Sequence, residues 1–598
     1  METRLRATAW VFALLLAVLV VRLGMLQVAQ GARFARLSDR NRIRQLVRPA
    51  SRGRIIDRKG NAIAETRPSF TATAVPTELD SVTVHRLASI LGLDYAELWR
   101  RIEPVAAWPS PITLKRNLRF DEVAQIAENS FRLPGVQIRT DPLRSYLLRE
   151  CCAHVVGYVA EASEEELARD TALRRLDYVG RSGIEAQYER LLRGRAGMEF
   201  VEVDARGQEI GPLREKRPEP PVPGKELHLT LDADLQELAW RLTGDFDRAA
   251  VVGIEVKTGA VICLVSRPAF DPTVFLGRVD AAAWNTLVGN PSKPFFNRAV
   301  TSGYPPGSTM KPAVALAALH RGLADRSTRL QPCTGSLRYG NRTFRCWGVH
   351  GSVNLVEALA VSCNVYFYQL GQRIGLDSLT GHARALGLGK ATGIDIPSEG
   401  AGNIPNRAWL DERYGKGRWG AGSVLNFSIG QGEVLATPLQ MACLYGAIAN
   451  GGVACQPHVL ARVDSAGRTI WRTPVKQTTL PVSQADLAVV RLGLDRVVEY
   501  GTGTAARMRE VTISGKTGTA QNPPRPDHAW FVGYAPSDDP QVVFAVLVEN
   551  AGHGGTVSAP IARQLVRQYF FPGQAVPPAP DPVDSAALAD SAPVEDSP

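Results

Sequence analysis

The sequence lacks the extremes of composition that mark disordered chains or multi-span membrane proteins. Hydrophobic residues make up 45% of its 598 residues and charged residues 21%, as in globular proteins. It also lacks any zinc-finger, helix-turn-helix or RNA-binding signature, although its net charge is +10. We therefore expect no nucleic-acid partner, and attribute the basic balance to a solvated surface or to attraction by anionic lipids or polymers.

Long apolar runs are absent except at the N-terminus. An uncharged run extends from Ala7 to Val21 and resumes after Arg22. If Arg22 reaches the outer interface, this predicts a cytoplasmic N-terminus at residues 1–6 and a transmembrane anchor at 7–28. The alternative is a cleaved signal peptide, with small residues at Ala29-Gln30-Gly31 as the cleavage site. Both readings export the remainder of the chain.

The exported part is too long for one core, because single cores stop growing near ~250 to 300 residues. A Pro-rich segment at 215–224 predicts a boundary, so we expect one domain at 29–225 and another at 226–571. Residues 572–598 are rich in Pro, Ala, Ser and Asp and predict a disordered tail. β-rich runs at both ends of the second domain, with helical segments between them, predict an α+β fold in which helices flank a sheet.

A serine and a lysine one helical turn apart form the candidate catalytic pair. Gly307-Ser308-Thr309-Met310-Lys311 opens an apolar helical pattern, which places Ser308 and Lys311 on one face. A neutral Lys311 could accept the serine proton, and desolvation or neighbouring cations would supply that neutral form. Because Ser-x-x-Lys is common by chance, the pair needs further partners.

Two further motifs follow in the order that acyl transfer requires. Ser362 can relay protons between Lys311 and a leaving amine, and Asn364 can hold a substrate amide. Lys516 adds positive charge from a predicted strand. The residues that follow it are the candidate substrate-binding residues: Thr517 and Thr519 for a carboxylate, and Gly518 for close approach of substrate backbone. The backbone N–H groups of Ser308 and Thr519 would form the oxyanion hole.

The Lys-Thr-Gly motif of residues 516–518 also occurs earlier, at Lys257-Thr258-Gly259. Choosing between the two copies tests the assignment of Lys516 to the site. The earlier copy precedes the nucleophile and lies at the predicted turn of a β-hairpin, so we assign it a structural role. Two histidines, His528 and His553, could lie near the site, but we assign neither a function.

These motifs resemble those of penicillin-binding proteins. The resemblance rests on residues 304–312, on Ser362-Cys363-Asn364 and on Lys516-Thr517-Gly518-Thr519-Ala520. It extends to residues 429–440, 501–504 and 530–534, and to residues 52–60 and 183–189, which resemble the non-catalytic pedestal of class B members. The resemblance implies an elongated pedestal, followed by a penicillin-binding/β-lactamase-like transpeptidase domain with an antiparallel sheet. No acidic glycosyltransferase pattern occurs in the first 225 residues, so class A is not indicated.

The resemblance implies that Ser308 attacks a D-Ala-D-Ala stem peptide and passes the acyl group to a neighbouring stem, and that β-lactams acylate the same serine. The Pro-Pro before Gly307 and the Cys/His segment described below resemble the elongation-specific branch of class B more than the division-specific one. The implied partners are a polymerase of the shape, elongation, division and sporulation (SEDS) family and other elongation proteins, at the inner membrane with the catalytic domain in the periplasm. A division-specific transpeptidase, a D,D-carboxypeptidase, a β-lactamase and a non-catalytic β-lactam sensor remain alternatives.

A second candidate site is built from cysteines. The spacing Cys333-x12-Cys346-x3-His350-x12-Cys363 offers three thiolates and one imidazole, which make a closed tetrahedral zinc site. The resemblance to the elongation branch also implies zinc at this place, where its members hold it partly through carboxylates that cysteines would replace here. The alternatives are a Cys333–Cys346 disulfide and a Cys363 that is merely buried. We expect no organic cofactor. The other cysteines are expected to be packing residues: Cys151, Cys152, Cys263, Cys443 and Cys455.

Overall fold

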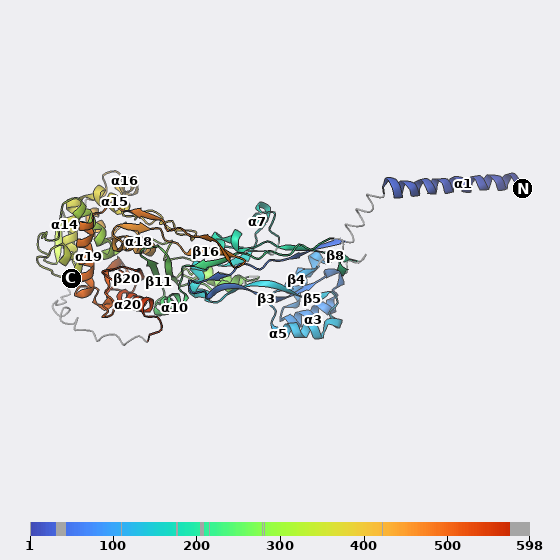
Figure 1. Cartoon of the computed structure of the whole chain (residues 1–598), viewed down its shortest axis with the longest axis horizontal. Helices are drawn as coiled ribbons and strands as arrows, with labels where there is room; N and C mark the ends of the chain where they lie inside the picture. Colours follow the sequence, from blue (N-terminus) through green and yellow to red (C-terminus); the bar gives the residue numbers. More distant parts are fainter. Residues whose placement is uncertain are drawn as a thin grey trace. The chain divides into compact units, whose positions relative to one another are not determined.

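The structure is a computed structural model that describes residues 2–30, 43–108, 111–174, 177–203, 209–213, 216–277, 279, 281–420 and 422–574. The chain forms two compact units (Figure 1). The first contains Met1–Leu229, Asp271–Trp284 and Leu460–Arg472, and the second contains Thr230–Phe270, Asn285–Val459 and Thr473–Pro598. The predicted disordered tail lies, from residue 575 onward, outside the described residues.

The N-terminal segment is helical, as predicted. Helix α1, Glu2–Gly24, continues as one π-helical turn, Met25–Ala29. Within the described parts of the chain, Glu2–Val28 is the only stretch of helix long and apolar enough to cross a membrane, and none of its apolar window is buried. The helix therefore fits a single-pass anchor; the choice between an anchor and a cleaved signal remains a prediction.

The first unit is organised around a seven-stranded sheet of order β17-β16-β10-β2-β3-β4, in which β5 also pairs with β3. Its strands are β2 Ile55–Ile56, β3 Ala62–Ala74, β4 Ile112–Lys115, β5 Val136–Tyr146, β10 Glu226–Leu229, β16 Leu460–Ser465 and β17 Arg468–Arg472. Strands β2 and β3 form an antiparallel hairpin. Its turn is held by the Asp57 carboxylate, which accepts from the backbone N–H groups of Lys59 and Asn61 at 2.8 and 2.7 Å.

Three helices cover part of this sheet: α3 Ser81–Leu91, α4 Tyr95–Ile102 and α5 Phe120–Glu128. Asp80 and Asp94 cap the first two, because each carboxylate accepts a backbone N–H of the first helical turn. The apolar faces of the helices meet Ala72 and Ala74 of β3 in one buried cluster. This packing, rather than helix propensity, holds such short helices.

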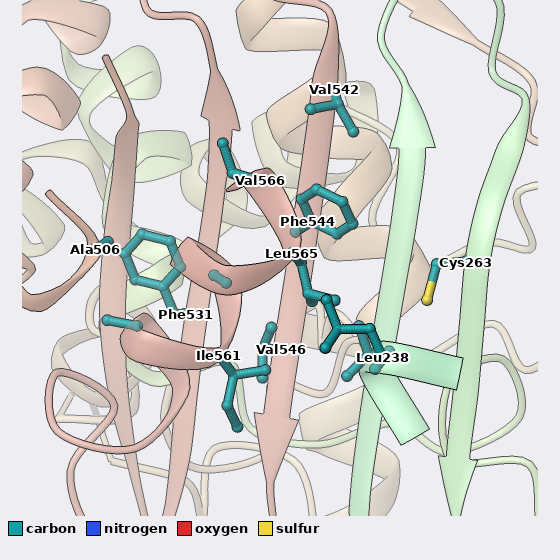
Figure 2. Close-up of a cluster of buried hydrophobic side chains, with 14 of the residues drawn as sticks. Leu238, Cys263, Ala506, Phe531, Val542, Phe544, Val546, Ile561, Leu565 and Val566 are labelled. Atoms are coloured by element: carbon teal, nitrogen blue, oxygen red, sulfur yellow. The ribbon is translucent and has the colours of Figure 1, made fainter. Parts of the chain in front are cut away.

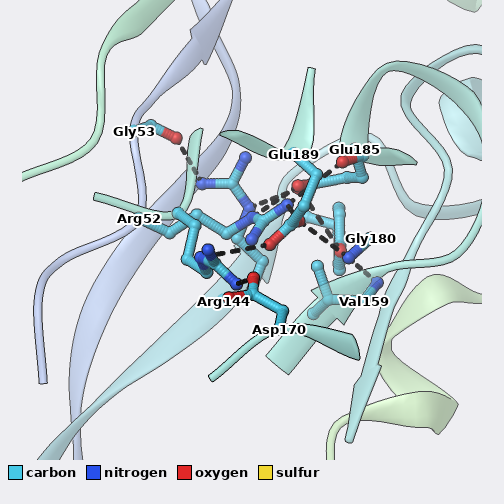
Figure 3. A network of polar contacts seen from close by, with 10 residues as sticks. Arg52, Gly53, Arg144, Val159, Asp170, Gly180, Glu185 and Glu189 are labelled. Carbon is cyan, nitrogen blue, oxygen red and sulfur yellow. Dashed lines mark hydrogen bonds and ion pairs between the residues drawn. The ribbon is translucent and has the colours of Figure 1, made fainter. Parts of the chain in front are cut away.

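A buried network of charges holds the start of the β2 hairpin (Figure 3). Glu185 is fully buried in α8, Gly183–Gln187, and receives Arg52 Nε and Arg144 Nε, each at 2.6 Å. Arg52 also pairs with Glu189 at 2.5 Å, and Arg144 Nη1 donates to the Gly53 carbonyl at 2.7 Å. Burial opposes ionisation of Glu185, but the two arginines more than offset it and lower the pKa of this carboxyl.

The sheet of the second unit is antiparallel, with strand order β12-β11-β21-β20-β19. Its strands are β11 Ala249–Glu255, β12 Val261–Arg267, β19 Ser514–Asn522, β20 Arg525–Ala535 and β21 Val542–Val548. The hairpin predicted to turn at Lys257-Thr258-Gly259 and the β-rich runs predicted at both ends of the domain are thus confirmed. The first strands of the unit pair with its last ones, as the α+β prediction requires.

Helices cover both faces of this sheet, which explains why its strands are apolar at nearly every position. All seven residues of β21 are buried. Phe544 and Val546 face a cluster that includes α10, Ala233–Leu242, and α20, Ser558–Phe570 (Figure 2). The opposite face of β21 packs on α18, Pro438–Ala449. A strand enclosed in this way reads as a continuous apolar run rather than an alternating one.

Four further helices position the candidate site: α12 Lys311–His320, α13 Leu355–Ala360, α14 Asn364–Ile374 and α19 Gln484–Glu499. Helix α12 packs on α14 and α19, and α13 packs on α19. Almost all of their apolar residues are buried. This close packing fixes the N-terminal ends of α12 and α14, which carry the polar side chains of the site.

Candidate active site

Ser308 lies in a single turn of 3-10 helix, Gly307–Met310, directly before α12. We predicted that Ser308 would open the α-helix itself. The α-helix instead begins at Lys311, where Pro312 in its first turn has the fixed φ that favours a helix start. Residues three apart align in a 3-10 turn, so Ser308 and Lys311 still share one side. Ser308 is half-buried and Lys311 is fully buried.

Lys311 is the centre of the polar contacts. Its Nζ donates to Ser362 Oγ at 3.1 Å, to the Ser362 carbonyl at 2.7 Å and to Asn364 Oδ1 at 2.8 Å. Among the described residues, no hydrogen bond joins Lys311 to the Ser308 hydroxyl. Catalytic hydrogen bonds often form only once substrate is bound. The structure therefore brings Lys311, Ser362 and Asn364 together and leaves Ser308 one helical turn away.

Ser362 has a backbone conformation that the sequence did not reveal. Its φ of 55° lies in the left-handed region, which costs a non-glycine residue about 1 to 2 kcal/mol. The turn separates α13 from α14. It lets the Ser362 hydroxyl contact Lys311 while the next side chain, Cys363, joins the other cysteines. Such strain is typical of functional sites.

Strand β19 carries the third motif and pairs with β20, so that Lys516 lies opposite Val532 and Thr519 opposite Ala529. Lys516 is fully buried and Thr517 is buried. Lys516 Nζ contacts the Thr517 carbonyl at 3.2 Å and Thr517 Oγ1 at 3.5 Å. The Thr519 carbonyl accepts from Gln431 Nε2 at 3.3 Å.

Glycines allow the nucleophile turn to lie against β19. A Cβ on Gly307 would lie 2.8 Å from the Thr519 carbonyl oxygen, and one on Gly430 would lie 2.3 Å from the Gly307 oxygen. A Cβ on Gly518 would lie 2.9 Å from Thr309 Cγ2 and 3.0 Å from the Pro306 oxygen. We expected Gly518 to make room for substrate. In the structure, its missing side chain makes room for the turn that carries Ser308.

Burial changes the ionisation of both lysines. Desolvation lowers the pKa of Lys311 to about 8, although the nearby thiols of Cys346 and Cys363 raise it somewhat. Desolvation also lowers the pKa of Lys516 well below its usual value, and the charge of Lys311 lowers it further. Lys311 is therefore close to the pKa that suits a general base near neutral pH.

The second copy of the lysine motif lies elsewhere. Lys257 is in the turn between β11 and β12, is 64% exposed and pairs with Asp539 at 2.9 Å. This placement confirms the predicted hairpin turn. It also provides a matched control for experiments on Lys516 or Lys311.

The four predicted metal ligands lie together. The donor atoms of Cys333, Cys346, His350 and Cys363 are all within 4.8 Å of one another. His350 Nδ1 is 3.6 Å from Cys333 Sγ and 3.5 Å from Cys346 Sγ, and Cys346 Sγ accepts the Asn364 backbone N–H at 3.2 Å. A hydrogen bond from the Cys363 thiol lowers the pKa of Cys346. Cys333 and Cys346 are thiols in the structure and are not joined to each other by a disulfide.

Sequence reasoning missed the residues that hold the segment before Ser308. Tyr304 Oη donates to Glu549 Oε1 at 2.7 Å, and Arg298 Nε donates to the same oxygen at 2.8 Å. Tyr304 packs edge-on against His528, whose Nδ1 accepts the Asn550 N–H at 3.2 Å. His528 is therefore a packing residue here, as expected. No sequence pattern links Glu549 to Tyr304, because the pairing depends on the sheet.

Comparisons with known proteins agree with this geometry. The family model described as the penicillin-binding protein transpeptidase domain matches residues 249–567, and that of the penicillin-binding protein dimerisation domain matches residues 47–229. The peptidoglycan D,D-transpeptidase MrdA of Acinetobacter baumannii is 36% identical over 582 residues, covering 93% of this chain and 85% of the relative. Its Escherichia coli K12 counterpart is 32% identical and covers 92% of each chain.

Solved structures are also similar. Penicillin-binding protein PBP2 of Helicobacter pylori, solved in complex with MreC, gives a TM-score of 0.77 at 26% identity and covers 88% of this chain and 99% of its own. A chain of a peptidoglycan synthase complex that coordinates polymerization and crosslinking gives 0.73 at 30% identity, covering 96% and 99%. The chain therefore belongs to the penicillin-binding protein family, as a class B member with a dimerisation domain before its transpeptidase domain. Its activity is that of a serine D,D-transpeptidase, and within class B it is PBP2-like.

Proposed function

We propose that this enzyme cross-links peptidoglycan stem peptides through a Ser308 acyl-enzyme during cell elongation and shape maintenance. The observation that supports these residue roles most directly is the contact of buried Lys311 with both Ser362 and Asn364. Lys311, with its pKa lowered to about 8, lies one helical turn from half-buried Ser308 and would act as its base, and Ser362 would relay the proton.

In the acylation step, Ser308 Oγ attacks the carbonyl of the penultimate D-Ala while neutral Lys311 takes its proton. The backbone N–H groups of Ser308 and Thr519 stabilise the oxyanion. Ser362, already hydrogen-bonded to Lys311, passes a proton to the leaving amine, and the terminal D-Ala departs. Because Asn364 Oδ1 accepts from Lys311, its Nδ2 group is the part that donates to a substrate carbonyl.

In the second step, the amine of a neighbouring stem attacks the ester carbonyl and displaces Ser308 Oγ. The amine proton returns through Ser362 and Lys311 to the serine, which restores the enzyme. Lys516, Thr517 and Thr519 bind the substrate carboxylate. Burial favours neutral Lys516, and an adjacent carboxylate would favour the ammonium form. A β-lactam would acylate Ser308 by the same first step, and the reaction would stop at the Ser308 ester.

The proposed setting is the inner membrane, with α1 as a single-pass anchor and the catalytic domain in the periplasm. The proposed partners are a SEDS-family polymerase and other elongation proteins. Similarity to a protein solved with MreC and to a chain of a peptidoglycan synthase complex supports this assignment.

Labelled penicillin tests the nucleophile. We expect the wild type to form one covalent adduct, and Ser308→Ala to form none, because no other oxygen occupies that place. Mass mapping of the peptide checks the site. An adduct on another residue, or none on the wild type, would contradict the proposal. Appreciable release of hydrolysed penicillin would favour a β-lactamase instead, and D-Ala release without cross-linking would favour a carboxypeptidase.

The thiol and imidazole cluster fits a structural zinc ion, which we propose as part of this enzyme. In a tetrahedral zinc site, sulfur and nitrogen ligands lie about 3.5 Å apart, and the two separations from His350 Nδ1 are 3.5 and 3.6 Å. The ion would fix Cys333, Cys346, His350 and Cys363. Since Cys346 also accepts the Asn364 N–H, the site would brace the catalytic turn without taking part in the reaction.

Metal analysis with thiol counting tests this site. We expect about one zinc per chain, and loss of zinc together with a lower thermal midpoint in Cys346→Ser. Cys263→Ser is the control, because this buried cysteine lies in β12, away from the cluster. Purified protein with no zinc and an oxidised Cys333–Cys346 pair would instead establish the disulfide.

A further inference from the structure

Thr502 is a polar residue next to the proposed carboxylate site that the mechanism does not use. It follows α19 in the segment Gly501-Thr502-Gly503-Thr504. Its Oγ1 lies 2.6 Å from Thr517 Oγ1, and either oxygen can be the donor. This is the shortest side-chain contact of Thr517, and it connects two segments that are 15 residues apart.

The backbone around Thr502 is fixed from several sides. Its N–H donates to the Ala360 carbonyl at 3.2 Å, just before the Ser362 turn. A Cβ on Gly501 would lie 2.3 Å from that carbonyl oxygen, and one on Gly555 would lie 2.6 Å from the Thr502 oxygen. Both neighbours must therefore remain small for Thr502 to keep its place. The packed backbone therefore fixes the position of Thr502, and with it the contact of its hydroxyl with Thr517.

Counting protons shows what this contact can do. A threonine hydroxyl has one proton and two acceptor lone pairs. In the ammonium form that a bound carboxylate favours, Lys516 Nζ, 3.5 Å from Thr517 Oγ1, can only donate to it. If Thr517 donates to Thr502, no proton is left for a substrate carboxylate. If Thr502 donates to Thr517, the Thr517 proton is free to point at the carboxylate, and aligned donors strengthen that bond.

We propose that Thr502 is a positioning residue for the substrate carboxylate: its hydroxyl donates to Thr517 and thereby directs the Thr517 proton to the substrate. The inference rests on the proposed function, in which Thr517 binds that carboxylate. It adds a residue from a segment outside the three catalytic motifs. Thr502 acts only through Thr517 and contacts no reacting atom.

The test compares benzylpenicillin, which carries a free carboxylate, with its methyl ester, which does not. The measured quantity is the ratio of their second-order acylation constants for Ser308. We expect Thr502→Val to lower the acid-to-ester ratio about fivefold, because the Thr517 hydroxyl loses the neutral hydrogen bond that orients and polarises its proton toward the carboxylate. Thr502→Ser, which keeps the hydroxyl, should restore the ratio to within about twofold. Thr504→Val is the matched control, since Thr504 is exposed in the same segment.

The ratio does not depend on the fraction of folded protein, so partial unfolding of a variant leaves the test valid. An unchanged ratio in Thr502→Val would overturn the inference, as would a Thr502→Ser variant as impaired as the valine. If the proposed function itself were wrong, the result would be different: the wild type would form no Ser308 adduct with benzylpenicillin.

Discussion

Replacing Lys311 with methionine should slow acylation of Ser308 by penicillin at least about 1,000-fold. Methionine keeps most of the side-chain volume but cannot accept the serine proton, and general-base catalysis contributes about 100- to 10,000-fold. The loss also removes the donor that holds Ser362 Oγ and Asn364 Oδ1. Stopped-flow acylation with a reporter β-lactam measures the effect.

Lys257→Met is the control for this experiment, because it makes the same substitution at a lysine that lies in an exposed turn, outside the site. We expect its acylation rate to match that of the wild type. Acylation by Lys311→Met within tenfold of the wild-type rate would rule out Lys311 as the base.

With Lys311 as the base, the rate of acylation should rise with pH. The pKa of Lys311 is lowered to about 8, chiefly by burial. Only the neutral amine accepts a proton, so its fraction rises with pH, from roughly one tenth at pH 7 to about half at pH 8. Acylation should therefore speed up roughly fivefold over that interval and level off above about pH 9. A rate that falls as pH rises from 7 to 8 would contradict the assignment.

Removing the charge of Glu185 should destabilise the first unit by about 3 to 5 kcal/mol. Glu185→Gln keeps the shape but leaves Arg52 and Arg144 buried without their common counter-ion (Figure 3). The segment before β2, which Arg52 holds, should then open first. Denaturant unfolding of the full-length protein in detergent, followed by limited proteolysis of residues 43–203, measures the change.

Asp141→Asn is the control for this variant. Asp141 pairs with Arg139, which is 54% exposed, and exposed ion pairs contribute only about 0 to 1 kcal/mol. An equal loss in both variants, or no loss in Glu185→Gln, would show that the buried network adds little stability. Penicillin acylation of the same samples reports whether the transpeptidase domain is still folded.

The sequence predicted the features that depend on residues close to one another along the chain. The motifs at Ser308, Ser362 and Lys516 were recognisable because each is contiguous, and the strands of the second unit because enclosed strands form apolar runs. The spacing of Cys333, Cys346, His350 and Cys363 likewise predicted a cluster, and the four side chains do lie together. Local chemistry therefore accounts for most of the site.

Features that depend on distant segments could not be predicted. The left-handed backbone of Ser362 follows from the packing of α13 and α14, since serine has no intrinsic preference for it. The contact of Thr502 with Thr517 and that of Tyr304 with Glu549 each require the folded sheet. The close approach of Pro306 and Thr309 to Gly518 also appeared only in the folded structure.

The close packing of Gly307, Gly430 and Gly518 limits how this enzyme can evolve under antibiotic selection. A side chain on any of them would collide with backbone or with a packed side chain, and two of them have a left-handed backbone with φ of 54° and 70°. Variants at these positions should lose cross-linking together with drug acylation. Drug-resistant forms of this enzyme should therefore arise from substitutions around the rim of the site, and the three glycines should remain unchanged in them.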